Sequence, residues 1–148
     1  EDLFRKIQVD FDYFMLLQPT SPLRDHTNII EAVDLFESLF SSFDFLVSVK
    51  EAEHPRILVN QIGEDHSLKF FDTDFSNYQR QAFKDYTPNG AIYIAKPKAY
   101  LLQKHFYGAK ALAYIMKDLD SVDVDNELDY KLAKLCMEEK LRNGGYQQ

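Results

Sequence analysis

The sequence has one cysteine and no long apolar run, and each absence excludes a class of protein. A single thiol, Cys136, cannot form an internal disulfide or a cysteine-rich zinc site. A helix that spans a bilayer needs ~20 consecutive apolar residues, and no run approaches that length. No stretch has the pattern of a signal peptide or of an internal repeat. We therefore expect a cytoplasmic protein with no membrane-bound part.

Basic residues are also scarce: 17 Lys and Arg stand against 24 Asp and Glu, for a formal net charge of −7. This balance argues against a nucleic-acid partner, which needs a basic surface. It leaves a nucleotide substrate open, because a metal ion neutralises phosphates locally. With 148 residues, 45% of them hydrophobic, the chain suits one domain over residues 1–148.

Polar residues follow the first predicted strand, residues 13–17, in a loop with two prolines. Ligands of open α/β sheets bind at the carboxyl ends of strands. Four side chains of this loop are therefore candidate ligand contacts: Gln18, Thr20, Ser21 and Arg24. The alternative is a rigid connection whose Ser and Thr cap the helix that follows.

Strands and helices alternate along most of the chain. Apolar residues at helical spacing predict a helix to about Phe40, and strands are predicted over residues 43–50, 90–95 and 112–116. We expect a turn at Pro88-Asn89-Gly90 and helices over 97–105 and after Asn126, the last with an apolar face of Leu128, Leu132 and Leu135. Residues 57–60 and 68–71 resemble a hairpin, and residues 72–86 show no period.

Asp123 and Asp125 are candidate metal ligands. In extended backbone, residues i and i+2 face the same way, so their carboxylates can converge on one cation. Mg²⁺ prefers such oxygen ligands and completes its shell with water and substrate phosphates. The alternative is capping of the last helix by Asp125 or Asn126.

Three segments in this order and at this spacing resemble the acylneuraminate cytidylyltransferases, the CMP-sialic acid synthetase family. They are LLQPTSPLR at residues 16–24, TPNGAIYI at 87–94 and SVDVDNELDY at 121–130. The resemblance runs from about Phe11 to Leu135 and corresponds to the C-terminal two thirds of the family domain. The basic, glycine-containing loop that holds CTP in the family is absent, so we expect either a fragment or a truncated relative.

The resemblance implies a three-layer, Rossmann-like nucleotidyltransferase fold with a mixed, mostly parallel sheet and an inserted hairpin arm. The arm, residues 56–86, is expected to mediate dimerisation. The implied reaction transfers CMP from CTP to a nonulosonic acid such as N-acetylneuraminate, with Mg²⁺ as cofactor. The resemblance also implies a homodimer. The alternative function is that of a catalytically silent truncated relative that binds the sugar or a partner subunit but not CTP.

The resemblance also implies roles for single residues. Asp123 and Asp125 would be catalytic and hold the metal, and Asn89-Gly90 would join Gln18, Thr20 and Ser21 around the sugar. Arg56 and Arg80 would meet the sugar carboxylate, because a planar guanidinium forms two parallel bonds to that group. From their local sequence alone, Asn89-Gly90 reads as a turn and both arginines as surface residues.

Overall fold

The computed structural model describes residues 11–71, 73–74 and 84–142. The chain divides into two compact units, residues 1–50 with 88–148, and residues 51–87. Among the described residues no helix is long and apolar enough to cross a membrane.

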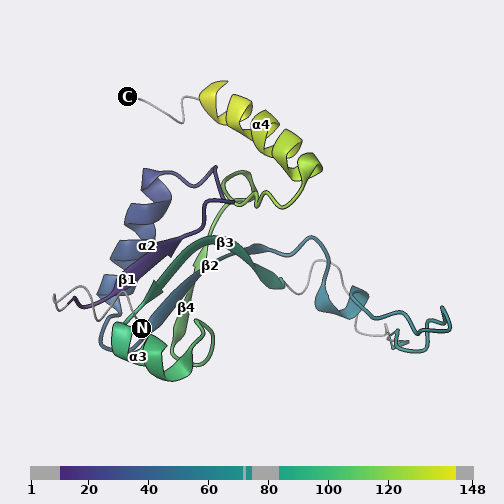
Figure 1. Ribbon diagram of the computed structural model, residues 1–148, viewed down its shortest axis with the longest axis horizontal. Helices are drawn as coiled ribbons and strands as arrows, with labels where there is room; N and C mark the ends of the chain where they lie inside the picture. Colours follow the sequence, from purple (N-terminus) through teal and green to yellow (C-terminus); the bar gives the residue numbers. More distant parts are fainter. Residues whose placement is uncertain (1–10, 72, 75–83, 143–148) are drawn as a thin grey trace. The chain divides into compact units, whose positions relative to one another are not determined.

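The first unit is built on a four-stranded sheet in the order β1-β3-β2-β4 (Figure 1). The strands are β1 (Phe14–Leu17), β2 (Phe45–Glu51), β3 (Tyr86–Ala95) and β4 (Ala111–Ile115). β1 pairs antiparallel with β3, and β2 pairs parallel with β4. The sheet is therefore mixed, and β3 separates the two strands that the α2 crossover joins in sequence.

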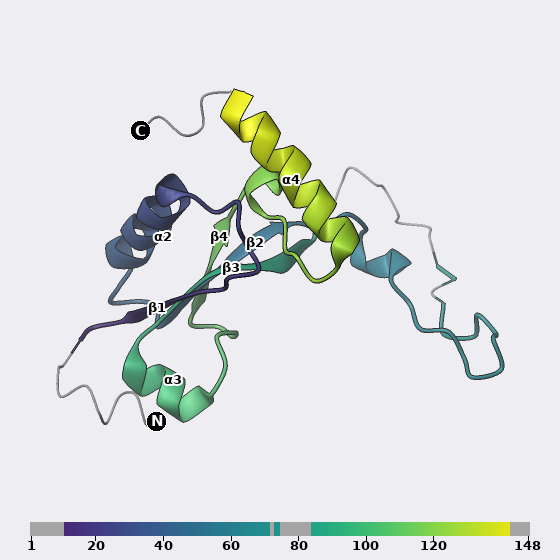
Figure 2. The ribbon, with the colours of Figure 1, turned by 45° about the horizontal axis from the view of Figure 1, so that its top comes forward.

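Helices cover the sheet, and the strand alternation assigns them to its two faces. On one face, Phe36 of α2 (His26–Ser38) packs in a buried cluster with Ile92 and Ile94 of β3. On the other, Tyr93 of β3 meets the ring of Phe106, which follows α3 (Pro97–Gln103), with centroids 4.9 Å apart. This alternation gives a three-layer α/β fold, and Figure 2 shows α2 and α3 on different sides of the strands.

The short helices and the last helix complete the first unit. A 3₁₀ turn, η2 (Asp118–Asp120), follows β4. The last helix, α4 (Glu127–Arg142), follows the segment that contains Asp123 and Asp125. The apolar face predicted for α4 exists but is exposed: Leu128 is 75% and Leu135 61% accessible. α3 is shorter than predicted because Lys104 adopts a left-handed conformation, φ 62°, and ends it.

Two local predictions were wrong. Strand β3 does not start after a turn at Gly90 but runs through Pro88-Asn89-Gly90 from Tyr86. Gly90 takes φ +75° there, so the strand bends without breaking. The hairpin predicted over residues 57–60 and 68–71 is not formed by the described residues, which instead hold a 3₁₀ turn, η1 (Arg56–Leu58), directly after Pro55.

Long-range bonds join the two ends of the second unit. The Arg56 N–H donates to Asp85 at 2.8 Å, and Lys84 pairs with Glu51 at 2.9 Å. Its large apolar side chains point to solvent: Leu58, Val59, Ile62, Leu68 and Phe70 are each at least 41% exposed. Among the described residues of this segment, 52–71, 73–74 and 84–85, no large apolar side chain is buried, so a hairpin there would have no core to pack against.

Candidate functional site

The three motif segments meet at the carboxyl end of β1. The Val124 N–H donates to the Thr20 carbonyl at 2.8 Å, which joins the third motif to the first. Ser21 Oγ donates to the Asn89 carbonyl at 3.4 Å, which joins the first motif to the second. Segments separated by up to about a hundred residues thus form one site within the first unit.

Gly90 is the point on which the site residues converge. A Cβ built on Gly90 would lie 2.6 Å from Gln18 Oε1, 3.1 Å from Asp123 Oδ2 and 3.4 Å from Ser21 Oγ. A side chain here would displace the Gln18 amide, and the positive φ independently favours glycine. The structure thus brings these four residues together, and their binding of a ligand stays a prediction.

Asp123 carries a buried oxygen without a partner. Its Oδ1 is inaccessible to solvent and receives no hydrogen bond from any described residue. A buried carboxylate oxygen that lacks a donor is costly unless a cation or a ligand meets it. The carboxylate therefore fits a hard cation such as Mg²⁺.

The Asp125 carboxylate is exposed and takes no part in capping α4. Asn126 is the cap: its Oδ1 accepts from the N–H groups of Leu128 and Asp129, at 2.8 and 3.1 Å. The Asp129 carboxylate in turn accepts from the Asn126 N–H at 3.1 Å. Capping thus leaves Asp125 available. The described residues contain no cluster of three or more His, Cys, Asp or Glu side chains, so a cation here would take its remaining ligands from water and substrate.

Arg24 is half-buried and holds the first motif against β3. Its Nη1 donates to the carbonyl oxygens of Gln18, at 3.2 Å, and Ala91, at 2.7 Å. Burial lowers the pKa of Arg24 below its ordinary value. Thr20 is exposed at the edge of the same loop, and Gln18 is half-buried beside Gly90.

The side chain of Asn89 is 4% exposed and faces the interior. Its Oδ1 accepts from Ser48 Oγ at 2.6 Å, and its Nδ2 donates to Ser121 Oγ at 2.9 Å. The asparagine predicted to contact a sugar is thus occupied by protein partners.

Sequence reasoning missed Tyr93, which lies beside the site. Burial, a hydrogen bond with Tyr107 and the nearby charge of Asp123 raise the pKa of Tyr93 to about 12. Tyr93 belongs to the second motif, three residues after Gly90, so its place in the sequence could have drawn attention to it. Its alternation with Ile92 and Ile94 places it on the opposite face of β3 from α2.

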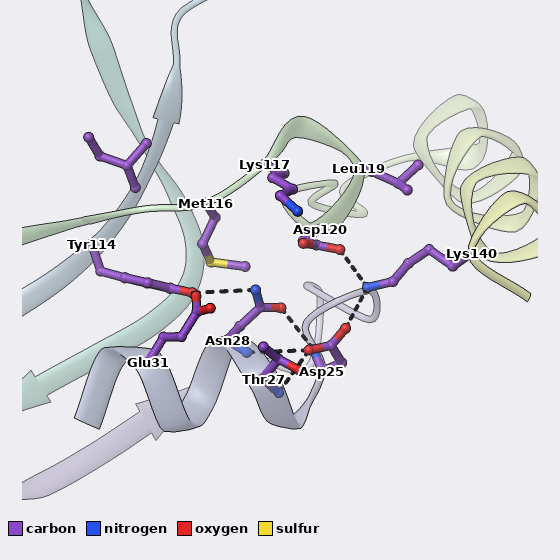
Figure 3. Close-up of a pocket in the computed structure, with 11 residues that line it drawn as sticks. Asp25, Thr27, Asn28, Glu31, Tyr114, Met116, Lys117, Leu119, Asp120 and Lys140 are labelled. Atoms are coloured by element: carbon purple, nitrogen blue, oxygen red, sulfur yellow. Dashed lines mark hydrogen bonds and ion pairs between the residues drawn. The ribbon is translucent and has the colours of Figure 1, made fainter. Parts of the chain in front are cut away.

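A second feature that the sequence did not reveal is a buried ion cluster next to the third motif. Lys140 of α4 donates to Asp25, at 2.9 Å, and to Asp120 (Figure 3). It also donates to the Leu23 carbonyl at 2.9 Å. Burial opposes the charge of Lys140, but its bonds to Asp120 and Asp25 outweigh that effect and raise its pKa. The cluster lines a pocket of about 360 Å³. The buried charges in this lining are bonded to one another.

Two predicted residues lie elsewhere. Arg56 is exposed in the second unit, at the start of η1. Arg80 lies outside the described residues. Their predicted contact with a sugar carboxylate remains a prediction.

Comparisons with known proteins agree with the motifs. An N-acylneuraminate cytidylyltransferase of Escherichia coli O18:K1:H7 is 43% identical over 136 residues, which is 92% of this chain and 32% of that protein. A CMP-N,N'-diacetyllegionaminic acid synthase of Legionella pneumophila is 29% identical over 91% of this chain and 58% of its own length. This chain therefore spans about a third of the first relative and under two thirds of the second.

A solved structure supports the fold. The 4-diphosphocytidyl-2C-methyl-D-erythritol synthase of Anaerococcus prevotii superposes with a TM-score of 0.56 over 93% of this chain and 64% of its own, at 8% identity. No protein-family model matches the chain. The fold is that of the Rossmann-like nucleotidyltransferases, and over nine tenths of its length the chain is homologous to the N-acylneuraminate cytidylyltransferases.

Proposed function

We propose that this chain belongs to an enzyme that transfers CMP from CTP to a nonulosonic acid, such as N-acetylneuraminate. The observation that carries the proposal is the Asp123 carboxylate, with its unpartnered buried oxygen beside Gly90 and Gln18. Three motifs of a family of CMP-sugar synthetases meet at this carboxylate. The relatives named above carry out this class of reaction on sialic and legionaminic acids by name.

In the proposed reaction, the anomeric hydroxyl oxygen of the sugar acid attacks the α-phosphorus of CTP. The bond from that phosphorus to the bridging oxygen of pyrophosphate breaks, and the hydroxyl proton passes to water. Catalysis of such transfers depends on positioning and on stabilising charge. A Mg²⁺ ion held by Asp123 and Asp125 would offset the negative charge on the phosphate oxygens.

The residues around Gly90 would bind the sugar. The Gln18 amide lies next to the space above Gly90, and the exposed Thr20 hydroxyl borders the same loop. Ser21 and Arg24 would keep this loop in place through their bonds to Asn89 and Ala91. Arg56 and Arg80 would reach the sugar carboxylate, each as a charge-assisted pair.

We also propose that the protein is a cytoplasmic homodimer and that residues 56–86 form its dimerisation arm. The exposed apolar side chains of the second unit support this proposal, since a partner would remove them from water. A symmetric dimer is the commonest assembly of soluble proteins.

The proposal is tested with the full-length protein, CTP, Mg²⁺ and N-acetylneuraminate or N,N'-diacetyllegionaminic acid. We expect pyrophosphate release and a CMP-sugar, detected by ³¹P NMR and mass spectrometry. Calorimetric titration of each substrate alone distinguishes the alternative. A protein that binds the sugar acid, fails to bind CTP and releases no pyrophosphate would be the silent module.

A further inference from the structure

Asn89 uses all its side-chain hydrogen-bonding capacity inside the protein. Its Oδ1 accepts from Ser48 Oγ and from the Ala91 N–H, at 2.6 and 3.2 Å. Its Nδ2 donates to Ser121 Oγ at 2.9 Å and to the Met116 sulfur at 3.3 Å. An amide has two donor hydrogens and two acceptor lone pairs, so none is left for a substrate.

The bond to Ser121 matters for the site because Ser121 stands two residues before Asp123. Asp123 Oδ1 receives no bond from the described residues, so no hydrogen bond of its own fixes this oxygen. The segment around it is held instead, through two side chains and one backbone group. Lys140 bonds to Asp120, Asn89 bonds to Ser121, and the Val124 N–H bonds to the Thr20 carbonyl.

We infer that Asn89 is a positioning residue, whose amide fixes Ser121 and thereby the Asp123 carboxylate beside Gly90. This inference rests on the proposed function, in which Asp123 holds the cation. It differs from the role that the motif resemblance implied, a direct contact with the sugar. Partners behind a metal-binding carboxylate commonly change metal affinity about 10- to 100-fold when removed.

Two serines allow a matched test. Ser48 and Ser121 are both buried, and each hydroxyl makes one bond with the Asn89 amide. Each also makes one bond with a backbone group, Ser48 with the Ile92 N–H and Ser121 with the Lys117 carbonyl. Only Ser121 lies in the segment that carries Asp123, whereas Ser48 lies in β2.

The experiment compares Ser121→Ala with Ser48→Ala in the full-length protein. We expect both to lower the melting temperature by a few degrees. Only Ser121→Ala should weaken Mn²⁺ binding, measured by electron paramagnetic resonance, by about tenfold. It should raise the Mg²⁺ concentration for half-maximal pyrophosphate release by a similar factor, with the KM for the sugar acid unchanged. If Ser121→Ala does not fold, Ser121→Cys, which fills the same space and accepts hydrogen bonds poorly, should act in the same direction.

Two results would overturn the inference alone. One is equal, wild-type Mn²⁺ affinity in both serine variants. The other is an Asn89→Ala variant that raises the KM for the sugar acid and leaves Mn²⁺ affinity as it was, which would indicate a direct sugar contact. A wild-type protein that neither binds Mn²⁺ nor releases pyrophosphate would instead overturn the proposed function, and the inference with it.

Discussion

The backbone N–H of Val124 donates to the carbonyl oxygen of Thr20 at 2.8 Å. This bond joins the loop after β1 to the segment that carries Asp123, across most of the length of the chain. Ser21 and Arg24 add bonds from the same loop to Asn89 and Ala91 at the base of β3. A change in any of the three motifs is therefore expected to disturb the other two.

Gly90→Ala should reduce both stability and activity. A non-glycine residue at φ +75° is strained, at a cost of about 1–3 kcal/mol. The new methyl group would also meet Gln18 Oε1 at 2.6 Å and Asp123 Oδ2 at 3.1 Å. Displacing groups that position a substrate reduces turnover on the order of 100-fold. Urea unfolding and pyrophosphate release measure the two effects.

Gly108→Ala is the control, because it separates strain from crowding. Gly108 has φ +128°, but nothing lies within 4 Å of a Cβ built there. This variant should lose a similar amount of stability and keep wild-type turnover. Equal activity of the two alanine variants would contradict the placement of Gln18 and Asp123 around Gly90.

Lys140→Met should destabilise the fold by about 3–5 kcal/mol, because it leaves two buried carboxylates without their cation. The Lys140 side chain is 6% exposed, and those of Asp25 and Asp120 are each 12% exposed. Lys134→Met, on an exposed part of the same helix, should be nearly neutral. Chemical denaturation measures the free energy of unfolding of both variants, provided that their m-values equal that of the wild type. A loss under 1 kcal/mol at Lys140 would show that the ion cluster carries little stability.

The Asp25 carboxylate predicts a pH dependence. Burial opposes its charge, but hydrogen bonds from Lys140 and from the Asn28 and Thr27 N–H groups outweigh burial and lower its pKa. Because the folded pKa is lowered, its stabilising contribution is complete above the unfolded value of about 4 and is lost as the pH falls below it. Asn also caps helices, so Asp25→Asn removes the charge and keeps the cap.

The stability difference between wild type and Asp25→Asn should therefore be constant from pH 8 to about 5 and shrink below about pH 4. Urea midpoints measured across this range test it. A difference that grows on acidification would mean that the carboxylate does not gain from Lys140.

The exposed apolar residues of the second unit predict an interface. Ile62 is 64% and Phe70 56% exposed, and each fully buried side chain of this size contributes about 1.5–3 kcal/mol. The double variant Ile62→Asp, Phe70→Asp should shift a dimer towards monomer in light scattering. Leu102→Asp, at an 89% exposed position of α3, should leave the mass unchanged. A wild-type protein that is monomeric at micromolar concentration would contradict the proposal that residues 56–86 form a dimerisation arm.

Local patterns predicted the elements of the first unit well. Strands were expected at the places of β1, β2, β3 and β4, and the helical spacing from Ile29 to Phe40 matches α2, whose Phe36 is fully buried. The strand order could not be read from these patterns, because placing β3 between β1 and β2 depends on pairing between distant segments. The proline and glycine of the second motif suggested a turn, whereas long-range bonds of Asn89 keep it within β3.

The proximity of several candidate site residues was predictable from the sequence, their individual contacts were less so, and their roles stay predictions. Motif spacing brought Gln18, Gly90 and Asp123 together, and the structure places them around one point. The interior role of Asn89 depends on Ser48 and Ser121, which lie 41 and 32 residues away. Lys140 reaches Asp25 across 115 residues, and no local pattern marks such a pair.

The proposed function depends on the Asp123 carboxylate, which would hold the cation that the reaction needs. The most direct test compares Asp123→Asn with Asp118→Asn in the full-length protein, since the exposed Asp118 loses the same charge five residues earlier. We expect Asp123→Asn to fold, to lose Mn²⁺ binding in electron paramagnetic resonance and to lose nearly all pyrophosphate release, while Asp118→Asn matches wild type. Wild-type Mn²⁺ affinity and turnover in Asp123→Asn would contradict the proposed role of Asp123 as a ligand of the cation.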